Sequence, residues 1–327
     1  PPRVEINSID YSKTTVQPGT DAKLSFSYET THFTPVEDQT VCYLTYTTAK
    51  THKLIRDNLD KCAMISGLIK GLGPRYCPSI EDKVVKFADK ERHQIFLEPE
   101  SKEMNTIYVQ GFSTSMPHDI QEKMVHSLPG LENCTILKYA YAIEYDAIDP
   151  LQLWPSLETK VLKNLFTAGQ INGTSGYEEA AGQGLIAGIN ASKKVKGNKP
   201  LILKRDEAYI GVLIDDLVTK GTKEPYRLLS SRAEYRLLLR SDNADYRLTE
   251  IGKNIGLIDD ERYLKFKDKY NKINQILHIL KTTYLGETSS INEGLLQKGY
   301  ERLSSGVKAI DILKRNGISY SFLKNYI

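Results

Sequence analysis

The sequence has few cysteines, no long apolar run and no recognisable leader. Its 327 residues include only four cysteines, Cys42, Cys62, Cys77 and Cys134, which are too few for a disulfide framework. None of their spacings is CxxC, so a zinc site is not expected. No stretch of about 18 apolar residues occurs, which argues against a membrane-spanning helix. These absences favour a cytoplasmic protein with free thiols and no metal centre.

The chain also lacks an initiator methionine, and residues 1–5 do not form a charged-then-apolar signal peptide. We therefore expect it to start inside a longer protein. Its length predicts two or three domains. Residues 193–327 carry 26 Lys and Arg against 17 Asp and Glu, which leaves 18 against 24 for residues 1–192. This asymmetry favours a polyanionic partner for the C-terminal half, although a basic surface without nucleic acid is also compatible with it.

Hydrophobic periodicity predicts an α/β arrangement followed by a mostly helical region. The predicted strands cover 22–28, 41–47, 94–97, 106–109 and 136–143. The predicted helices in the first half cover 51–58, 78–90 and 119–127. After the linker at 193–200 glycine becomes rarer and helical patterns dominate, the longest of them at 263–281. No internal repeat is present.

A glycine-rich loop, 169–176, follows a strand predicted at 165–168 and precedes a helix predicted at 177–192. Strand, glycine loop and helix form the βα half of a nucleotide-binding unit, in which backbone amides and the helix start attract negative charge. The alternative is a tightly packed βα unit without a ligand. The spacing of Gly182, Gly184 and Gly188 is not a dinucleotide fingerprint, because it falls within the predicted helix. The chain contains no proper GxGxxG motif.

Cys77 precedes a predicted helix start, where Pro78 suits the first turn and Ser79 with Asp82 has capping-box spacing. A helix N-terminus and the nearby Arg75 would lower the thiol pKa and favour a nucleophilic thiolate. A buried, inert cysteine is the alternative. Cys62 and Cys134 are interpreted as structural. His52 and His93 could donate protons or simply be hydrogen-bonded.

Arg232, Arg236 and Arg240 recur at every fourth position, so a helix would place them on one face. Arg227 and Arg247 flank them, and tyrosines are interleaved. Arginine binds phosphate bidentately and tyrosine stacks on unpaired bases, which favours an RNA-binding face. The alternative is a surface neutralised by the nearby acids Glu234, Asp242 and Asp245.

Three blocks of the sequence resemble the GidA/MnmG family of flavin-dependent tRNA-modifying enzymes. They are residues 166–181 (FTAGQINGTSGYEEAA), residues 222–249 (from TKEPYRLLSSRAEYRLLLR to DNADYRLT) and residues 73–83 (GPRYCPSIEDK). The resemblance implies part of a Rossmann-like FAD-binding domain in 1–40 and 136–200. It implies a mixed α/β insertion on the NAD and substrate side in 41–135, and a mainly helical tRNA- and partner-binding region in 201–327. It also implies that the family's N-terminal FAD fingerprint and its C-terminal end lie outside the chain.

The resemblance further implies an activity. FAD, reduced by NADH, helps install an aminomethyl or carboxymethylaminomethyl group at C5 of the wobble uridine. Methylene-tetrahydrofolate supplies the carbon, and the enzyme works as a homodimer with the GTPase MnmE. Two other functions stay open. One is a folate- and FAD-dependent tRNA uracil-5-methyltransferase, and the other is a non-catalytic tRNA- or partner-binding fragment.

The implied site residues fall into four groups. The catalytic candidates are Cys77, as the thiolate attacking a uracil ring carbon, and Cys42 as second choice. The FAD-loop candidates are Gly169, Gln170, Asn172, Gly173 and Gly176, with Gln170 matching a flavin-nucleotide contact. The NAD-side candidates are Gly73, Pro74, Arg75, Tyr76, Ser79, Glu81, Asp82, Lys83 and Phe87. The RNA-binding candidates are Arg227, Arg232, Arg236, Arg240 and Arg247. No metal ligands are expected.

Overall fold

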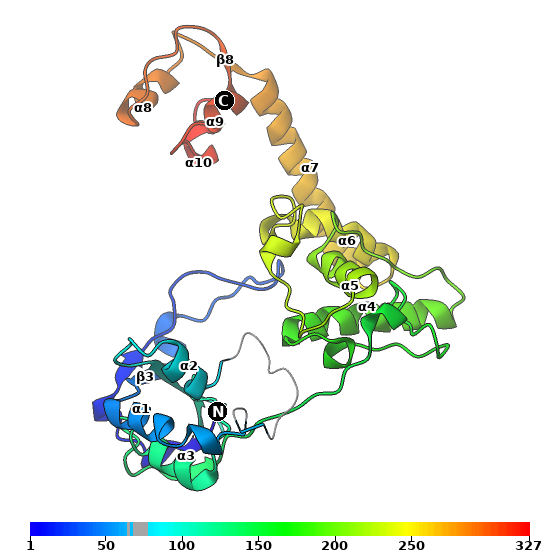
Figure 1. The fold of residues 1–327 in the computed structure, drawn as a ribbon. Helices are drawn as coiled ribbons and strands as arrows, with labels where there is room; N and C mark the ends of the chain where they lie inside the picture. Colours follow the sequence, from blue (N-terminus) through cyan, green and yellow to red (C-terminus); the bar gives the residue numbers. More distant parts are fainter. Residues whose placement is uncertain (64–65, 68–77) are drawn as a thin grey trace. The chain divides into compact units, whose positions relative to one another are not determined.

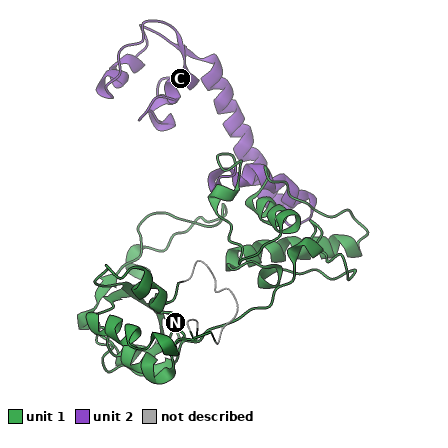
Figure 2. Ribbon diagram, in the orientation of Figure 1, with its two compact units in different colours: residues 1–238 green, residues 239–327 purple. Residues whose placement is uncertain are grey.

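The computed structural model describes residues 1–63, 66–67 and 78–327. The chain forms two compact units, residues 1–238 and residues 239–327 (Figures 1 and 2). The first unit contains two separate hydrophobic cores, one in a sheet region within residues 1–140 and one in a helical region within residues 146–238. The second unit has a core of its own.

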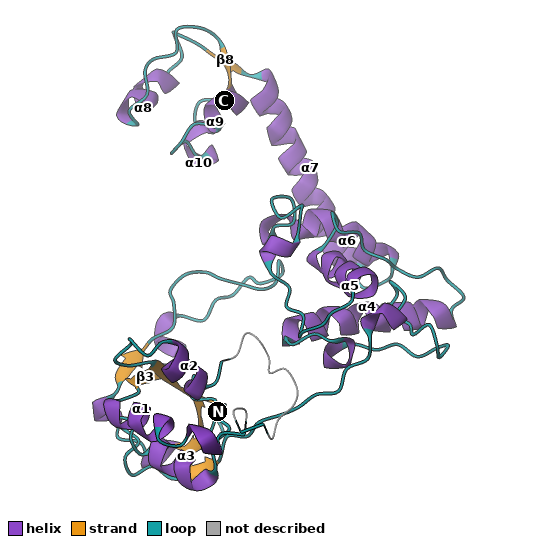
Figure 3. Cartoon of the chain, in the orientation of Figure 1, coloured by secondary structure: helices purple, strands orange, loops and turns teal. Residues whose placement is uncertain are grey.

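A six-stranded antiparallel sheet forms the sheet region, with strand order β2-β3-β4-β5-β1-β6. Figure 3 colours the strands orange and the helices purple. The strands are β1 (Arg3–Glu5), β2 (Thr15–Gln17), β3 (Cys42–Tyr46), β4 (Gln94–Pro99), β5 (Thr106–Gln110) and β6 (Ile136–Lys138). β1 and β6 therefore pair in one sheet with strands from the predicted insertion. How these segments divide into functional domains stays a prediction.

Alternating side chains bury one face of this sheet. Ile95 and Leu97 in β4, and Ile107 and Val109 in β5, are fully buried, as period-two alternation predicts. They pack against α1 (Ala49–Arg56), α2 (Ile80–Lys86) and α3 (His118–Val125). Burial of such side chains stabilises the fold by about 1.5–3 kcal/mol each.

The helical region contains α4 (Tyr177–Val195) and α5 (Tyr209–Lys220). Its core includes Leu153, Ile186 and Leu217. The helix predicted at 177–192 is confirmed. The strand predicted at 165–168 is wrong, because this segment forms only an isolated bridge between Glu158 and Phe166. Its carbonyl and amide groups bond locally instead, Leu165 O accepting from Thr159 N at 2.8 Å and Thr167 N donating to Leu157 O at 3.2 Å.

Residues 22–28 do not form the predicted strand either. Leu24 and Phe26 are exposed, and no ladder forms between the end of β2 and the start of β3. The Gln39 side chain instead stabilises the segment between β2 and β3. It donates to Thr34 O at 2.9 Å and accepts from Thr20 N at 3.1 Å. Alternation alone is not sufficient for a strand, because a strand also needs a neighbouring strand to pair with.

The second unit is mostly helical. Its elements are α6 (Ala244–Asn254), α7 (Asp260–Thr282), β7 (Tyr284–Leu285), α8 (Ile291–Gln297), β8 (Val307–Lys308), α9 (Ala309–Leu313) and α10 (Tyr320–Leu323). Asp259 caps α7 by accepting from Arg262 N, and α7 includes the helix predicted at 263–281. Buried Asp245 joins α6 to α7, accepting from Lys269 at 2.5 Å and Tyr270 at 2.7 Å.

Short 3-10 helices complete the described elements. They are η1 (Ile6–Ser8), η2 (Tyr11–Lys13), η3 (Val36–Asp38), η4 (Leu59–Lys61), η5 (Pro150–Gln152), η6 (Gly169–Asn172), η7 (Ser230–Arg232) and η8 (Ser241–Asn243). Within the described residues no helix has the length and apolar character needed to cross a bilayer. The fold is α/β with a helical C-terminal region, as the sequence predicted.

Candidate functional site

The glycine loop is a 3-10 turn, η6, that leads into α4. Gly169 and Gly173 have φ values of +84°, in the left-handed region that favours glycine. A Cβ atom on Gly173 would lie 2.7 Å from the Thr222 Cγ2 atom, so a larger residue would displace the neighbouring segment. These two glycines allow the tight approach of the loop to the rest of the region.

A buried amide pair shapes the inside of this loop. Asn172 is fully buried and donates to Gln183 Oε1 at 2.8 Å and to the Thr167 carbonyl at 2.9 Å. Gln183 in turn donates to Thr174 Oγ1 at 3.0 Å and accepts from Gly169 N at 3.3 Å. The Asn172 side chain therefore shapes the loop, and a direct contact between it and a cofactor stays a prediction.

An ion pair covers the start of α4. Glu179 has a side chain only 3% exposed and lies 3.2 Å from Arg227 Nη1, while its other oxygen accepts from Leu228 N at 2.8 Å. A Cβ atom on Gly176 would collide with both Arg227 and Glu179. Gly176 thus allows the close approach of these two side-chain ends, and an internal carboxylate lies near the helix start that would otherwise attract an anion.

The outward side of the loop offers a different set of groups. The amides of Gly169, Gly173 and Ser175 donate to protein acceptors, so they do not form an open phosphate cradle. Gln170 is exposed, and Tyr177 at the start of α4 is 84% exposed. The outward side of the loop therefore presents a side-chain amide and a phenol ring, and a contact between them and a flavin nucleotide stays a prediction. Gln170 was a predicted contact residue, whereas no sequence motif pointed to Tyr177.

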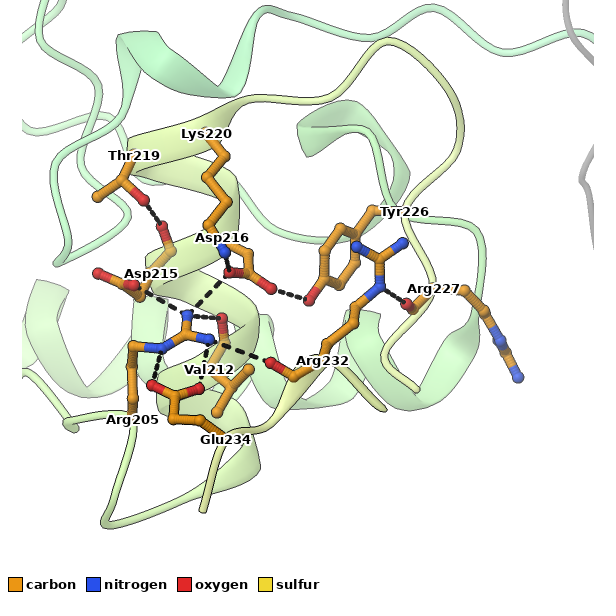
Figure 4. A network of polar contacts seen from close by, with 10 residues as sticks. All are labelled: Arg205, Val212, Asp215, Asp216, Thr219, Lys220, Tyr226, Arg227, Arg232 and Glu234. Atoms are coloured by element: carbon orange, nitrogen blue, oxygen red, sulfur yellow. Dashed lines mark hydrogen bonds and ion pairs between the residues drawn. The ribbon is translucent and has the colours of Figure 1, made fainter. Parts of the chain in front are cut away.

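A charged network centred on Arg205 fixes the segment that follows α5 (Figure 4). Arg205 lies 2.9 Å from Asp215 and 2.8 Å from Asp216, and it forms two hydrogen bonds with Glu234, at 2.7 and 2.8 Å. It also donates to the Arg232 carbonyl at 3.1 Å. One guanidinium thus joins α5 to residues 232–234, a role that periodicity did not predict.

Asp216 is the buried acid of this network, with a side chain only 4% exposed. Burial by itself would raise its pKa, but hydrogen bonds from Lys220, Tyr226 and Arg205 outweigh burial and hold the pKa below its usual value. The Tyr226 hydroxyl donates to Asp216 Oδ2 at 2.8 Å, and burial raises the pKa of Tyr226. Glu234, hydrogen-bonded to Arg205, has its pKa lowered to about 2. Asp216 therefore stays ionised near neutral pH.

The predicted arginine helix over 232–240 is wrong. Residues 230–232 form η7, and hydrogen-bonded turns follow it. Arg205 donates a hydrogen bond to the carbonyl of Arg232, and Arg232 Nε donates to the Arg227 carbonyl at 2.8 Å. In a continuous helix the Arg232 carbonyl would accept from Arg236 N, whereas here Arg236 N donates to the Ala233 carbonyl at 3.3 Å. Three candidates, Arg227, Arg232 and Arg236, lie in the first unit.

The five arginines differ in how far they are engaged. Arg227 pairs with Glu178 and Glu179, and Arg232 lies 4.4 Å from the centre of the Tyr226 ring. In the second unit, Arg240 pairs with Asp242 at 2.9 Å and Arg247 donates to Asn243 at 3.0 Å. Arg236 is exposed and has no ion-pair partner within the described residues. Of the five, Arg236 is therefore the most available for a phosphate.

The cysteine candidates are only partly described. Cys77, with Gly73, Pro74, Arg75 and Tyr76, lies outside the described residues. Cys42 lies in β3, where burial and the Glu98 carboxylate raise its thiol pKa. A raised pKa favours the protonated thiol, so Cys42 is a poor nucleophile at neutral pH.

The helix after Cys77 is capped as the sequence predicted. Ser79 and Asp82 form a capping box, with Asp82 N donating to Ser79 Oγ at 3.1 Å. Lys83 donates to the Gly111 carbonyl at 3.1 Å, and Phe87 is half exposed at the end of α2. The NAD-side role of these residues stays a prediction.

Glu81 in the first turn of α2 is almost completely buried. Its Oε1 atom accepts from Thr114 at 2.5 Å and from Ser115 N at 3.0 Å, whereas Oε2 has no hydrogen-bond partner among the described residues. The structure therefore gives Glu81 a part in joining α2 to residues 114–115. No group of three possible metal ligands occurs in the part of the chain that the structure describes.

Comparison with known proteins gives consistent matches along the chain. The family model for glucose inhibited division protein A matches residues 1–199, and the model for the tRNA modifying enzyme MnmG/GidA C-terminal helical domain matches residues 260–327. The tRNA uridine 5-carboxymethylaminomethyl modification enzyme MnmG of a Bacillus cereus strain is 60% identical over 323 residues. The enzyme of the same name from Geobacillus kaustophilus is 58% identical over 324 residues.

Each of these two alignments covers 99% of this chain but 51% of the relative, so the chain spans about half the length of the curated relatives it matches. Two crystal forms of Aquifex aeolicus GidA are similar in structure, form I with a TM-score of 0.79 and 48% identity, and form II with 0.77 and 45%. Each match covers 92% of this chain and 52% of the other. The likeness therefore extends to the fold as well as to the sequence.

Proposed function

The chain belongs to the MnmG/GidA family, and from that premise we propose that it takes part in modifying the wobble uridine of tRNA. The observation that carries the proposal is the match over residues 1–199 and 260–327, supported by 60% identity to a curated MnmG enzyme. The modification adds an aminomethyl or carboxymethylaminomethyl group at C5 of the uracil ring. We place the activity in the cytoplasm, in a homodimer that acts together with the GTPase MnmE.

FAD, reduced by NADH, supplies the redox chemistry of this proposal, and methylene-tetrahydrofolate supplies the carbon. Within the chain we assign Gln170 to a hydrogen bond with the flavin nucleotide and Tyr177 to stacking beside it. Both side chains are exposed on the outward side of the glycine loop. Asn172 and Gln183 keep that loop in shape through buried hydrogen bonds.

We assign the nucleophile to Cys77 rather than to Cys42. A thiolate is required for addition to a uracil ring carbon. The capped helix that begins after Ser79 favours a thiolate just ahead of it, whereas the raised pKa of Cys42 disfavours one. The RNA phosphates are assigned to the arginines at 227, 232, 236, 240 and 247, with Arg236 the most available of them.

A binding module without catalysis is the second candidate. It is favoured by the internal hydrogen bonds of three loop amides, which leave fewer donors for a pyrophosphate. The tRNA uracil-5-methyltransferase is disfavoured by the match of residues 260–327 to the MnmG/GidA C-terminal helical domain.

Titration of the purified chain with FAD, followed by flavin fluorescence, separates these candidates. We expect saturable binding that Gln170→Ala weakens by about 2- to 10-fold, the effect of one neutral hydrogen bond. Gln275→Ala, at an exposed position in α7, is the matched control and should bind like the unaltered chain. Absence of FAD binding together with retained tRNA binding would favour the binding module, and equal affinities of both variants would remove the role of Gln170.

A further inference from the structure

A second group of basic residues occurs in the helical region, outside the arginine-bearing segment 227–247 of the tRNA proposal. It consists of two lysines on the turn at 160–164 and four lysines at the end of α4 and just after it. We call this set the lysine surface: Lys160, Lys163, Lys193, Lys194, Lys196 and Lys199. Cations are favoured near the C-terminal end of a helix because the backbone carbonyls there carry partial negative charge. The sequence predicted a linker at 193–200, whereas α4 continues to Val195.

Two polar contacts hold the turn against the end of α4. Glu158 forms an ion pair with Lys194 and also accepts from Asn164 N at 2.8 Å. Asn190 donates to the Ser156 carbonyl at 3.2 Å and accepts from Leu201 N at 2.6 Å. The six lysines, although separated in sequence, therefore belong to one continuous part of the helical region.

The turn itself is well ordered by its own hydrogen bonds. The Thr159 hydroxyl donates to the Leu162 carbonyl at 2.6 Å, and Leu162 N donates back to that hydroxyl at 3.2 Å. Asn164 has φ +67°, in the left-handed region that asparagine tolerates. Lys160 Nζ donates to the Leu151 carbonyl at 2.6 Å. The backbone that carries Lys160 and Lys163 is thus fixed before any ligand binds, which lowers the entropic cost of binding.

The charge of this surface is largely uncompensated. Of its six lysines only Lys194 forms an ion pair within the described part of the chain, and Glu158 is its partner. The hydrogen bond from Lys194 lowers the pKa of Glu158, so this acid stays ionised and offsets one positive charge. The remaining excess of positive charge is suited to a polyanion.

An exposed aromatic ring lies next to the lysines. Trp154, the single tryptophan of the chain, is 52% exposed, and Lys160 Nζ lies 5.1 Å from the centre of its ring. Indole rings stack on unpaired bases irrespective of their identity, and neighbouring cations bind the adjoining phosphates. Val161 and Leu162 are also exposed, but they occupy a short turn rather than an amphipathic helix, which favours RNA over a lipid surface.

We propose that the lysine surface and Trp154 form a second tRNA-contact surface, in which the lysines bind backbone phosphates and Trp154 stacks on an unpaired base. This inference rests on the proposed function, because tRNA is the polyanion that function supplies. It adds a set of contacts distinct from Arg227, Arg232 and Arg236. The two sets contribute separately to affinity.

The test measures binding of a fluorescently labelled, unmodified tRNA transcript to the purified chain over a series of salt concentrations. The triple variant Lys160→Gln, Lys163→Gln, Lys196→Gln should lower affinity at least about tenfold at low salt and reduce the log–log salt slope by about 2–3, as expected for three lost phosphate contacts. Trp154→Leu should weaken binding by about 5- to 100-fold with an unchanged slope, because it removes stacking and no charge.

The matched control removes three exposed lysines from the sheet region: Lys23→Gln, Lys102→Gln and Lys123→Gln. It makes the same change in net charge and should leave the salt slope close to that of the unaltered chain. Circular dichroism checks that each variant is folded. If the lysine-surface triple variant binds tRNA no more weakly than this control, the inference is overturned while the proposed function stands.

Two other outcomes are equally decisive. If the unaltered chain does not bind the transcript at any salt concentration, the proposed function itself fails, and the inference fails with it. If the triple variant binds tRNA normally but loses binding to vesicles containing an anionic phospholipid, the surface belongs to a lipid and the RNA assignment is wrong.

Discussion

The sheet region and the helical region of the first unit are held together by different means. The sheet region has a core of fully buried apolar side chains such as Ile95, Leu97 and Ile107. The helical region also has an apolar core, but its loops depend on buried polar groups, including Asn172 and Asp216. Apolar packing tolerates changes of similar volume, whereas a buried charge requires particular partners. The two regions should therefore respond differently to conservative substitutions.

The largest expected effect is at Asp216 in the helical region. Asp216→Asn keeps the shape of the side chain but removes the buried counter-ion of Arg205 and Lys220, and Arg205 keeps only the more exposed Asp215 and Glu234. We expect a loss of about 3–5 kcal/mol in the stability of this region. Urea denaturation followed by the fluorescence of Trp154 measures it. The control Asp215→Asn removes a more exposed acid and should cost less than about 1 kcal/mol; similar losses for both variants would contradict the special role of Asp216.

A smaller effect is expected in the glycine loop. Asn172→Ala removes the donor to Gln183 and leaves buried acceptors unsatisfied, at a cost of about 1–3 kcal/mol. Amide hydrogen exchange of residues 167–176 should report faster opening in the variant. Asn198→Ala, at an exposed position, should change exchange in this loop very little, and an equal effect of both substitutions would argue against the buried amide pair.

The core of the sheet region should tolerate conservative substitutions better than the polar network of the helical region does. Ile107→Val removes one methyl group from a fully buried side chain and should cost about 0.5–1.5 kcal/mol. Hydrogen exchange of β4 and β5 measures this loss separately from the tryptophan signal. A loss as large as that of Asp216→Asn would show that the two regions do not differ in the way described.

The smallest effect near neutral pH should come from two histidines of the sheet region. Burial lowers the pKa of His52 and of His93, so the unfolded chain binds protons more readily than the folded one just below about pH 6.5. Stability of the sheet region should therefore fall as the pH drops from about 7 to about 6. The pKa of Asp216 is also lowered in the folded chain, so the helical region should keep its stability until the pH falls to about 3.9, where an unfolded aspartate begins to gain a proton.

Hydrogen exchange of β5 and the Trp154 signal, measured across this pH range, distinguish the two regions. His93→Gln should flatten the response of the sheet region, whereas His118→Gln, which lies in α3, serves as the control. If the helical region loses stability before the sheet region on mild acidification, the assignment of this pH response to His52 and His93 is wrong.

The sequence predicted best where apolar periodicity decides the structure. The strands that contain Leu97 and Val109 and the helix that starts at Tyr177 are all present close to their expected positions, because buried faces repeat with the period of the element. Ser79 and Asp82 were also predictable, since a capping box depends only on residues three positions apart.

Prediction failed where side chains distant in sequence determine the backbone. Arg205 donates to the carbonyl of Arg232, and residues 233–240 form turns in place of the helix that the arginine spacing indicates. Glu179 and Arg227, 48 positions apart, cover the helix start that was expected to attract a phosphate. No local pattern reveals such pairs. The two adjacent acids Asp215 and Asp216, within the otherwise apolar helix α5, were the one sign in the sequence of a buried charge network.

We propose that the network around Asp216 holds residues 227–236 in the conformation that contacts tRNA in the proposed function. The affinity of Asp216→Asn for a labelled tRNA transcript, compared with that of Ile107→Val, tests it most directly. We expect Asp216→Asn to weaken binding about tenfold, because fewer molecules hold the competent conformation, and Ile107→Val to bind like the unaltered chain. Unchanged affinity of a folded but destabilised Asp216→Asn chain would contradict the claim.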